Sequence, residues 1–361
     1  MRHFSEFFKE PFALFSSPDY QCGKMICYSL VREKGASHPP SLYSPNFFEM
    51  NSDRHFFSIL SQHIIDLKEF EDHLQTLRPS PLQESFTYSL STEKSFKENI
   101  KDIQALIQKS PLRKAVPYAF ANASRSFALK KSELAYTILA AMKEQQLNRG
   151  ILFGLFEEER GILGLTPEIL LQKKSESFET MALAGTILSM PGASEKLLND
   201  PKEKAEHEWV IKGIVKELSE IGITQLGEIR TKKSGRLTHL ETPISILNPS
   251  KPFGEIVQKL HPTPALGGYP RSEANDWLKK QEVFLPRSRF GAPFSINTSD
   301  LEIAIVAIRC LEWSKLEGFI RIGAGCGIVA ESVLEKEWME IQNKWASITQ
   351  SLGLKNVEPR G

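Results

Sequence analysis

The 361-residue chain has little cysteine and no excess of charge of either sign. Its four cysteines, Cys22, Cys27, Cys310 and Cys326, show no paired C-x-x-C spacing, so neither a disulfide framework nor a cysteine zinc site is indicated. Lys and Arg number 45 against 44 Asp and Glu, a balance that gives no general attraction to nucleic acid or to an anionic membrane. We therefore expect reduced thiols, a cytoplasmic location and a small-molecule partner.

Long apolar runs and nucleotide-binding signatures are also missing. No uncharged stretch is long enough to span a membrane, and Glu6, Lys9 and Glu10 interrupt the apolar residues at the N-terminus, which leaves no signal-peptide core. Neither GxGxxG nor GxxxxGK occurs, which argues against a dinucleotide or ATP site. The 41% hydrophobic content is nevertheless sufficient for a large globular core.

Three segments carry the periodicity of amphipathic helices. Apolar residues recur at steps of three and four within residues 93–110, 200–222 and 332–352. The second segment begins with Asp200 as a candidate N-cap and Pro201 in its first turn. The third begins with Ser332 and Glu335, the spacing of a capping box. We expect all three to be helices.

Short apolar runs before the first of these helices and strand-like runs between the helices predict strands. They cover residues 24–31, 56–60, 150–156, 169–173, 178–182, 301–310 and 318–322. Because no regular βαβ rhythm appears, we predict an α+β fold with mainly antiparallel sheets and peripheral amphipathic helices. We expect one domain over residues 1–361, in which residues 1–90 supply support and residues 91–350 the catalytic part.

Two pairs of glutamates stand three residues apart on predicted helices. Glu203 and Glu206 occupy one helix face, and Glu337 and Glu340 occupy a face of another. Two such helices facing each other would assemble the oxygen ligands that Mg²⁺ prefers. The alternative is that both pairs lie on solvated helix surfaces, where charged pairs at this spacing are common.

Small and turn-forming residues mark three candidate ligand-binding segments. Gly185 and Thr186 follow a predicted strand, and Gly325 and Gly327 follow another, so backbone N–H groups there can approach an anion closely. The third segment, HPTPALGGYPR, combines three prolines with two adjacent glycines and can form a rigid wall. Its His261 is either a hydrogen-bond donor to a ligand or a structural loop histidine.

Taken in order, these segments resemble the motif series of the chorismate-binding enzymes. The series reads LGLTPEILL, ALAGT, KEKAEH, HPTPALGGYPR, AIVAIR, GAGCGIV and EWMEIQNK. The resemblance implies the chorismate-binding enzyme fold and an Mg²⁺-dependent conversion of chorismate. HPTPALGGYPR is similar to the isochorismate and salicylate synthase branch, which uses water. Ala184 stands where aminodeoxychorismate synthases have a nucleophilic lysine, so a covalent lysine adduct is not expected.

The resemblance also implies roles for individual residues. Lys114 matches the general base and Glu168 the general acid. The cluster Glu203, Glu206, Glu337 and Glu340 would surround Mg²⁺, and the substrate pocket would comprise Gly185, Thr186, His261, Arg309, Gly325, Gly327 and Lys344. Isochorismate formation is the expected reaction, in a menaquinone or siderophore pathway, by a monomer without an obligatory glutaminase subunit.

The chain departs from the family pattern at several positions, which keeps two alternatives open. Pro117 interrupts the run after Lys114 and predicts an edge strand or a bulge there. Ile187 follows the AGT motif where a basic residue is common, and Phe290 stands where tyrosine is frequent. The alternatives are a salicylate synthase, which adds pyruvate elimination, and a catalytically impaired chorismate-binding paralogue.

Overall fold

The structure is a computed structural model that describes residues 11–16, 23–32, 39–50, 55–124, 129–148 and 150–360. Cys22 and the charged N-terminal segment lie outside these ranges. Cys27, Cys310 and Cys326 are buried free thiols, as expected. Among the described residues, no helix combines the length and the apolar character needed to cross a membrane.

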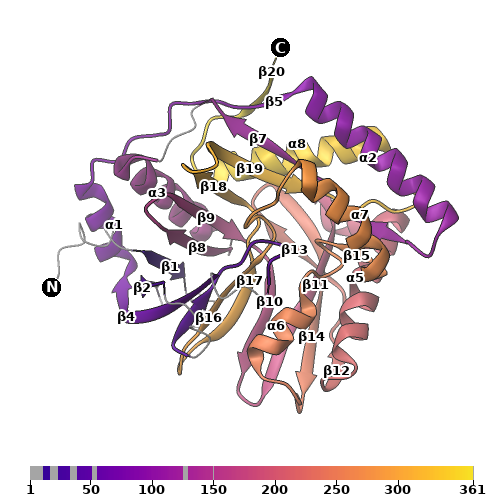
Figure 1. Cartoon of the computed structure of the whole chain (residues 1–361), viewed down its shortest axis with the longest axis horizontal. Helices are drawn as coiled ribbons and strands as arrows, with labels where there is room; N and C mark the ends of the chain where they lie inside the picture. The colour runs from indigo at the N-terminus through magenta and orange to yellow at the C-terminus, as the bar shows by residue number, and fades with distance from the viewer. Residues whose placement is uncertain are drawn as a thin grey trace.

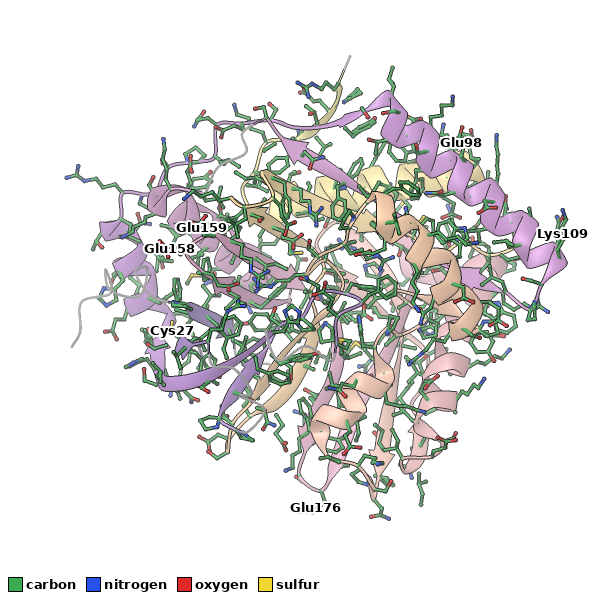
Figure 2. All side chains as sticks on the ribbon, viewed as in Figure 1. Cys27, Glu98, Lys109, Glu158, Glu159 and Glu176 are labelled. Atoms are coloured by element: carbon green, nitrogen blue, oxygen red, sulfur yellow. The ribbon has the colours of Figure 1, made fainter. Side chains whose placement is uncertain are left out.

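The predicted α+β fold is confirmed. The described part of the chain forms eight helices: α1 (Leu67–Thr76), α2 (Leu90–Lys109), α3 (Lys131–Asn148), α4 (Ala193–Asn199), α5 (Pro201–Leu218), α6 (Phe253–Leu260), α7 (Arg271–Phe284) and α8 (Leu334–Ser351). The three predicted helices correspond to α2, α5 and α8. Helix α2 is amphipathic as expected, because Phe96, Ile100 and Ile103 are buried and Glu98 and Lys109 project from its outer side (Figure 2).

The described residues form one extended, mostly antiparallel sheet and a separate two-stranded sheet. The strands are β1 (Phe12–Ser16), β2 (Lys24–Val31), β3 (Ser41–Tyr43), β4 (Phe56–Asp66), β5 (Phe86–Ser89), β6 (Lys114–Ala115), β7 (Tyr118–Ala123), β8 (Ile151–Phe156), β9 (Arg160–Thr166), β10 (Ile169–Lys174), β11 (Ser177–Leu188), β12 (Ile223–Leu226), β13 (Arg230–Ser234), β14 (Leu237–Leu247), β15 (Gly268–Tyr269), β16 (Pro293–Asn297), β17 (Glu302–Val306), β18 (Cys310–Ser314), β19 (Phe319–Gly325) and β20 (Val357–Arg360). Strands β6 and β15 form the two-stranded sheet.

Hydrogen-bonded pairing orders the main sheet as β14, β11, β10, β17, β16, β3, β4, β2, β1, β8, β9, β18, β19, β7, β5 and β20. Strands β12 and β13 both pair with the outer side of β14, and among the pairings of the described strands only that of β5 with β20 is parallel. Figure 1 shows α2 and α8 along the upper part of the view and α5 and α6 on its lower right. The helices therefore cover different parts of one continuous sheet.

Two hydrophobic clusters fill the interior. The larger one packs α2, α3 and α8 against strands that include β7, β8, β9 and β19. Trp338 and Trp345 of α8 meet edge to face within it, with ring centroids 5.6 Å apart. The smaller cluster packs α5 and α6 against β10, β11, β14 and β17. Phe48 and Ile308 pack against both clusters and so connect them.

Two details of the sequence prediction are wrong. Helix α8 begins at Leu334 with Val333 as its N-cap and no capping side chain. Ser332 instead accepts a hydrogen bond from the Val329 N–H, and Glu335 is exposed, so the predicted capping box does not form. The apolar run 301–310 is two strands, β17 and β18, because the backbone turns at Arg309, where φ is +55°.

The predicted cap of α5 does form. Asp200 is extended, and its Oδ1 accepts hydrogen bonds from the backbone N–H groups of Lys202 (2.9 Å) and Glu203 (3.1 Å). Pro201 fills the first helical position, where no N–H partner is needed. The cap thus fixes the helix turn from which Glu203 and Glu206 project.

We predict that Asp200→Ala lowers the free energy of unfolding by about 1 kcal/mol, because two N–H groups in the first turn of α5 lose their acceptor. Urea denaturation of both proteins measures the change. Asp200→Asn, which keeps the acceptor oxygen, should lie within a few tenths of a kcal/mol of the parent. Equal stability of the alanine variant and the parent would contradict the assigned cap.

Candidate active site

A cavity lies between the two hydrophobic clusters, and most of the predicted site residues line it. The predicted residues on its wall are Glu168, Gly185, Thr186, Glu206, Arg309, Gly325, Gly327 and Lys344. Side chains that the sequence prediction did not select, including Tyr118, His239 and Arg287, also face it. Segments separated by more than 150 residues therefore meet at one site.

The conformation of Gly185 explains how β11 reaches this cavity. The register of β11 against β14 shifts between Ala184 and Thr186, and Gly185 between them has φ = +75°. A bulge with a left-handed glycine redirects the strand. The Thr186 N–H consequently points at Glu203 and donates a 2.8 Å hydrogen bond to its Oε2. A Cβ at position 185 would approach three Glu203 atoms at 3.3 Å.

His239 connects the two polar groups on the cavity wall, Thr186 and Arg309. Its Nδ1 lies 3.0 Å from Thr186 Oγ1 and its Nε2 lies 3.3 Å from Arg309 Nη2. Burial and the charge of Arg309 hold the pKa of His239 well below its usual value, so the ring is neutral. Because arginine only donates, Nε2 accepts and Nδ1 carries the hydrogen. The Thr186 hydroxyl then accepts from His239 and keeps its own hydrogen for a ligand.

Arg309 is held on its other side by α8. Its Nη1 donates to Ser347 Oγ at 3.0 Å, and burial lowers its pKa to about 10, which still leaves it charged at neutral pH. Lys344 lies one turn before Ser347, where its Nζ donates to the Gly325 carbonyl at 2.6 Å and lies 2.6 Å from Glu340 Oε1. Helix α8 thus positions two cationic side chains at the cavity.

Lys114 is completely buried beside the cavity, on β6. Its Nζ lies 3.2 Å from Glu206 Oε1, but the described residues offer it no acceptor in hydrogen-bonding geometry. A Cβ at Gly327 would come within 2.3 Å of Lys114 Cε, so a glycine is required there. Pro117 lies in the break between β6 and β7, whereas the prediction was an edge strand or a bulge.

Glu168 follows the end of β9 and is also buried. Burial raises the pKa of its carboxyl to about 7, although Lys114 and Lys232 act in the opposite direction. A carboxyl of this kind holds a proton near neutral pH and can give it to a ligand. Glu168 and Lys114 therefore provide a proton donor and an amine at one site.

The four predicted metal ligands come together, and we call Glu203, Glu206, Glu337 and Glu340 the carboxylate cluster. Three of them surround the ammonium of Lys202, whose Nζ lies 3.1 Å from Glu203, 3.2 Å from Glu206 and 3.2 Å from Glu337. Burial opposes ionisation of Glu206, but Lys114 and Lys202 outweigh it and hold its pKa at about 2. The cluster is thus an interior group of charges, not a solvated helix surface.

The donor set of the carboxylate cluster fits a divalent cation of the oxygen-seeking kind. Its oxygens converge on one positively charged atom, Lys202 Nζ, which is a stand-in for such an ion. In the present arrangement no group of three or more acidic, histidine or cysteine side chains among the described residues is spaced as a ready metal site. The lysine keeps the oxygens farther apart than Mg²⁺ would, since Mg²⁺ binds at about 2.0–2.1 Å.

His261 does not reach the cavity, contrary to the prediction that it contacts a substrate. Its Nε2 lies 2.8 Å from the Phe47 carbonyl oxygen, and the two rings pack edge to face. Burial lowers its pKa to about 3, so the ring is neutral. The alternative that His261 is a structural loop histidine therefore describes it better. The same loop still forms part of the cavity wall through Ala265 and Leu266.

Lys202 and His239 are among the residues that the sequence prediction missed. Lys202 stands four residues before Glu206 on α5, a spacing at which opposite charges interact. His239 lies in the buried part of β14, where a polar side chain needs a hydrogen-bond partner. Only the fold shows that Lys202 contacts Glu337 of α8 and that His239 contacts Thr186 of β11.

We predict that Glu168 makes stability fall as pH rises between pH 4 and pH 8. With a folded-state pKa of about 7 against 4.5, the folded protein binds more protons than the unfolded chain over this interval, which amounts to about 3 kcal/mol. Glu168→Gln lacks this contribution, so urea unfolding at both pH values should show a smaller loss in the variant. The same pH dependence in both proteins would contradict the raised pKa.

Comparison with known proteins agrees with the motif order. Residues 44–353 match the sequence profile described as chorismate binding enzyme. The chain is 32% identical over 213 residues to the salicylate biosynthesis isochorismate synthase of Pseudomonas aeruginosa, covering 55% of this chain and 44% of that protein. It is 33% identical over 216 residues to isochorismate synthase MenF of Bacillus subtilis, covering 56% and 44%. The chain thus spans about half the length of the curated relatives it matches.

A solved structure shares the fold over nearly the whole chain. MenF, the menaquinone-specific isochorismate synthase from Escherichia coli, superposes with a TM-score of 0.72 at 18% identity, covering 95% of this chain and 88% of that one. At this identity the likeness concerns the fold. Together with the match over residues 44–353, it shows that the chain belongs to the chorismate-binding enzyme family.

Proposed function

We propose that the protein is an isochorismate synthase, which isomerises chorismate to isochorismate. The observation that supports this most is the buried Lys114 amine, 3.2 Å from Glu206, beside the cavity lined by Glu168, whose carboxyl has a raised pKa. Two of the similar proteins are named isochorismate synthases. The reaction needs a base for water and an acid for the departing hydroxyl, and these two side chains meet that requirement.

Chorismate is a dianion, so its site must offset two negative charges. Arg309 and Lys344 place cationic groups at the cavity, and the free hydrogen of Thr186 faces the same space. The carboxylate cluster would repel the substrate unless a cation neutralised it. The proposed anionic substrate therefore explains why cationic side chains line a site that also contains four glutamates.

We propose that Glu203, Glu206, Glu337 and Glu340 hold Mg²⁺, some of them through water. When bound, Mg²⁺ would offset the charge of the cluster and polarise a substrate carboxylate. The convergence of three carboxylates on Lys202 Nζ supports the choice of these ligands.

The acid and base steps follow from the chain's own residues. Lys114 takes a proton from water as the water oxygen bonds to ring carbon 2, and the ring double bonds shift. Glu168 delivers its proton as the bond between carbon 4 and its oxygen breaks, so one water enters and one leaves. Lys114 then holds the proton taken from the attacking water, Glu168 is left as a carboxylate, and proton exchange with solvent restores both groups. A rigid cavity that orients these groups supplies several kcal/mol of the barrier reduction.

The attacking group is water, so we propose that the enzyme needs no glutaminase subunit. We also propose that it is a cytoplasmic monomer. The product is a precursor of the kind used in menaquinone or siderophore synthesis. Incubation with chorismate and Mg²⁺, followed by chromatography of the products, tests the assignment. Isochorismate supports it, whereas salicylate with pyruvate would assign a salicylate synthase. Binding of chorismate without any product would assign an impaired paralogue.

We predict that Lys114→Ala and Glu168→Gln each lower isochorismate formation at least 100-fold, the order expected for loss of a general base or acid. Mg²⁺ binding, measured by isothermal titration calorimetry, should persist because neither residue belongs to the carboxylate cluster. Lys109→Ala and Glu98→Gln, on the outer side of α2 (Figure 2), are the matched controls and should keep parental activity. Normal turnover in Lys114→Ala would show that the base lies elsewhere.

A further inference from the structure

Lys202 occupies an unusual position for a lysine. It lies in the first turn of α5, where the helix dipole favours negative side chains and disfavours positive ones. Its side chain is 17% exposed, and its Nζ contacts three carboxylates from two helices at 3.1–3.2 Å. The dipole of α5 therefore disfavours the positive charge of Lys202, and the contacts with Glu203, Glu206 and Glu337 stabilise it.

The charges around Lys202 explain why a cation is needed between α5 and α8. The carboxylate cluster contributes four negative charges when ionised, and Lys114, Lys202 and Lys344 contribute three positive ones. Lys114 contacts Glu206, and Lys344 contacts Glu340, so Lys202 is the cation that joins α5 to α8. Without it, three carboxylates would face one another across the interface of the two helices and repel.

A divalent cation bound by the same oxygens would compete with this ammonium for space and charge. Mg²⁺ binds oxygen at about 2.0–2.1 Å, so it would lie within the volume that Lys202 Nζ now fills. The lysine has a flexible four-carbon stem, and its partial exposure gives it a path to solvent. Its neighbour Lys204, in contrast, is exposed and lies outside the contacts of the cluster.

We propose that Lys202 is an internal counter-ion that holds the carboxylate cluster together in the metal-free protein and is displaced outward when the divalent cation binds. This inference rests on the proposed use of Mg²⁺. Lys202 is then a positioning residue that keeps the ligands converged and lowers the apparent affinity for the metal.

Calorimetric titration of Mg²⁺ into the full chain and into Lys202→Met tests the competition. Methionine keeps much of the apolar stem and removes the charge, so the variant should bind Mg²⁺ at least tenfold more tightly than the parent. It should also melt at a lower temperature than the parent without metal and recover with saturating Mg²⁺. The control Lys204→Met should stay within twofold of the parental affinity. Equal or weaker binding by Lys202→Met, or no binding by either protein, would overturn the inference.

Lysine acetylation followed by mass spectrometry tests the displacement in the unaltered protein, which avoids any folding defect of the variant. Saturating Mg²⁺ should raise the acetylation rate of Lys202 at least fivefold and leave that of Lys204 unchanged. An unchanged rate at Lys202 while calorimetry shows bound Mg²⁺ would overturn the inference. Isochorismate formation measured on the same sample distinguishes the two proposals, because an active enzyme with a protected Lys202 contradicts the displacement alone.

Discussion

The burial of four glutamates in one place is the constraint on which the rest of the site depends. Like charges repel strongly away from water, so each carboxylate needs a cation or N–H group nearby. Lys114, Lys202 and Lys344 supply the cations, and the Gly185 bulge turns the Thr186 N–H toward Glu203. The cap of α5 and the buried tryptophans of α8 hold the two helices from which these carboxylates project. Fold and electrostatics are therefore coupled at the cavity.

The cavity also brings together the groups that the proposed chemistry requires. Glu168 follows the end of β9 and lines the cavity together with Glu206, and burial raises the pKa of its carboxyl to about 7. Lys114 lies beside Glu206 but has no hydrogen-bond acceptor among the described residues. Arg309 takes a left-handed backbone conformation and is held by His239 and Ser347, so a cationic group is fixed before any anion arrives. Such preorganisation lets the site stabilise charge without rearranging.

The sequence predicted the helix faces, and most of the site residues that it named line the cavity, since periodicity places Glu203 beside Glu206 and motif order places α5 and α8 in one site. It could not predict contacts that depend on tertiary packing. The charge partner of Glu337 is Lys202, which lies on a helix far away in the sequence. Nothing in the continuous run 301–310 indicates the turn at Arg309. His261 matched a family position, but packing against Phe47 keeps it from the cavity. Local pattern identifies candidates, whereas packing decides which of them meet.

The central claim is that cation binding at the carboxylate cluster and binding of the anionic substrate are energetically coupled. Calorimetric titration of chorismate into the Lys114→Ala protein, with and without saturating Mg²⁺, measures this coupling without turnover. The account predicts that Mg²⁺ strengthens chorismate binding at least tenfold, and that chorismate strengthens Mg²⁺ binding by the same factor, as linkage requires. Equal chorismate affinity with Mg²⁺ and with a chelator would contradict it.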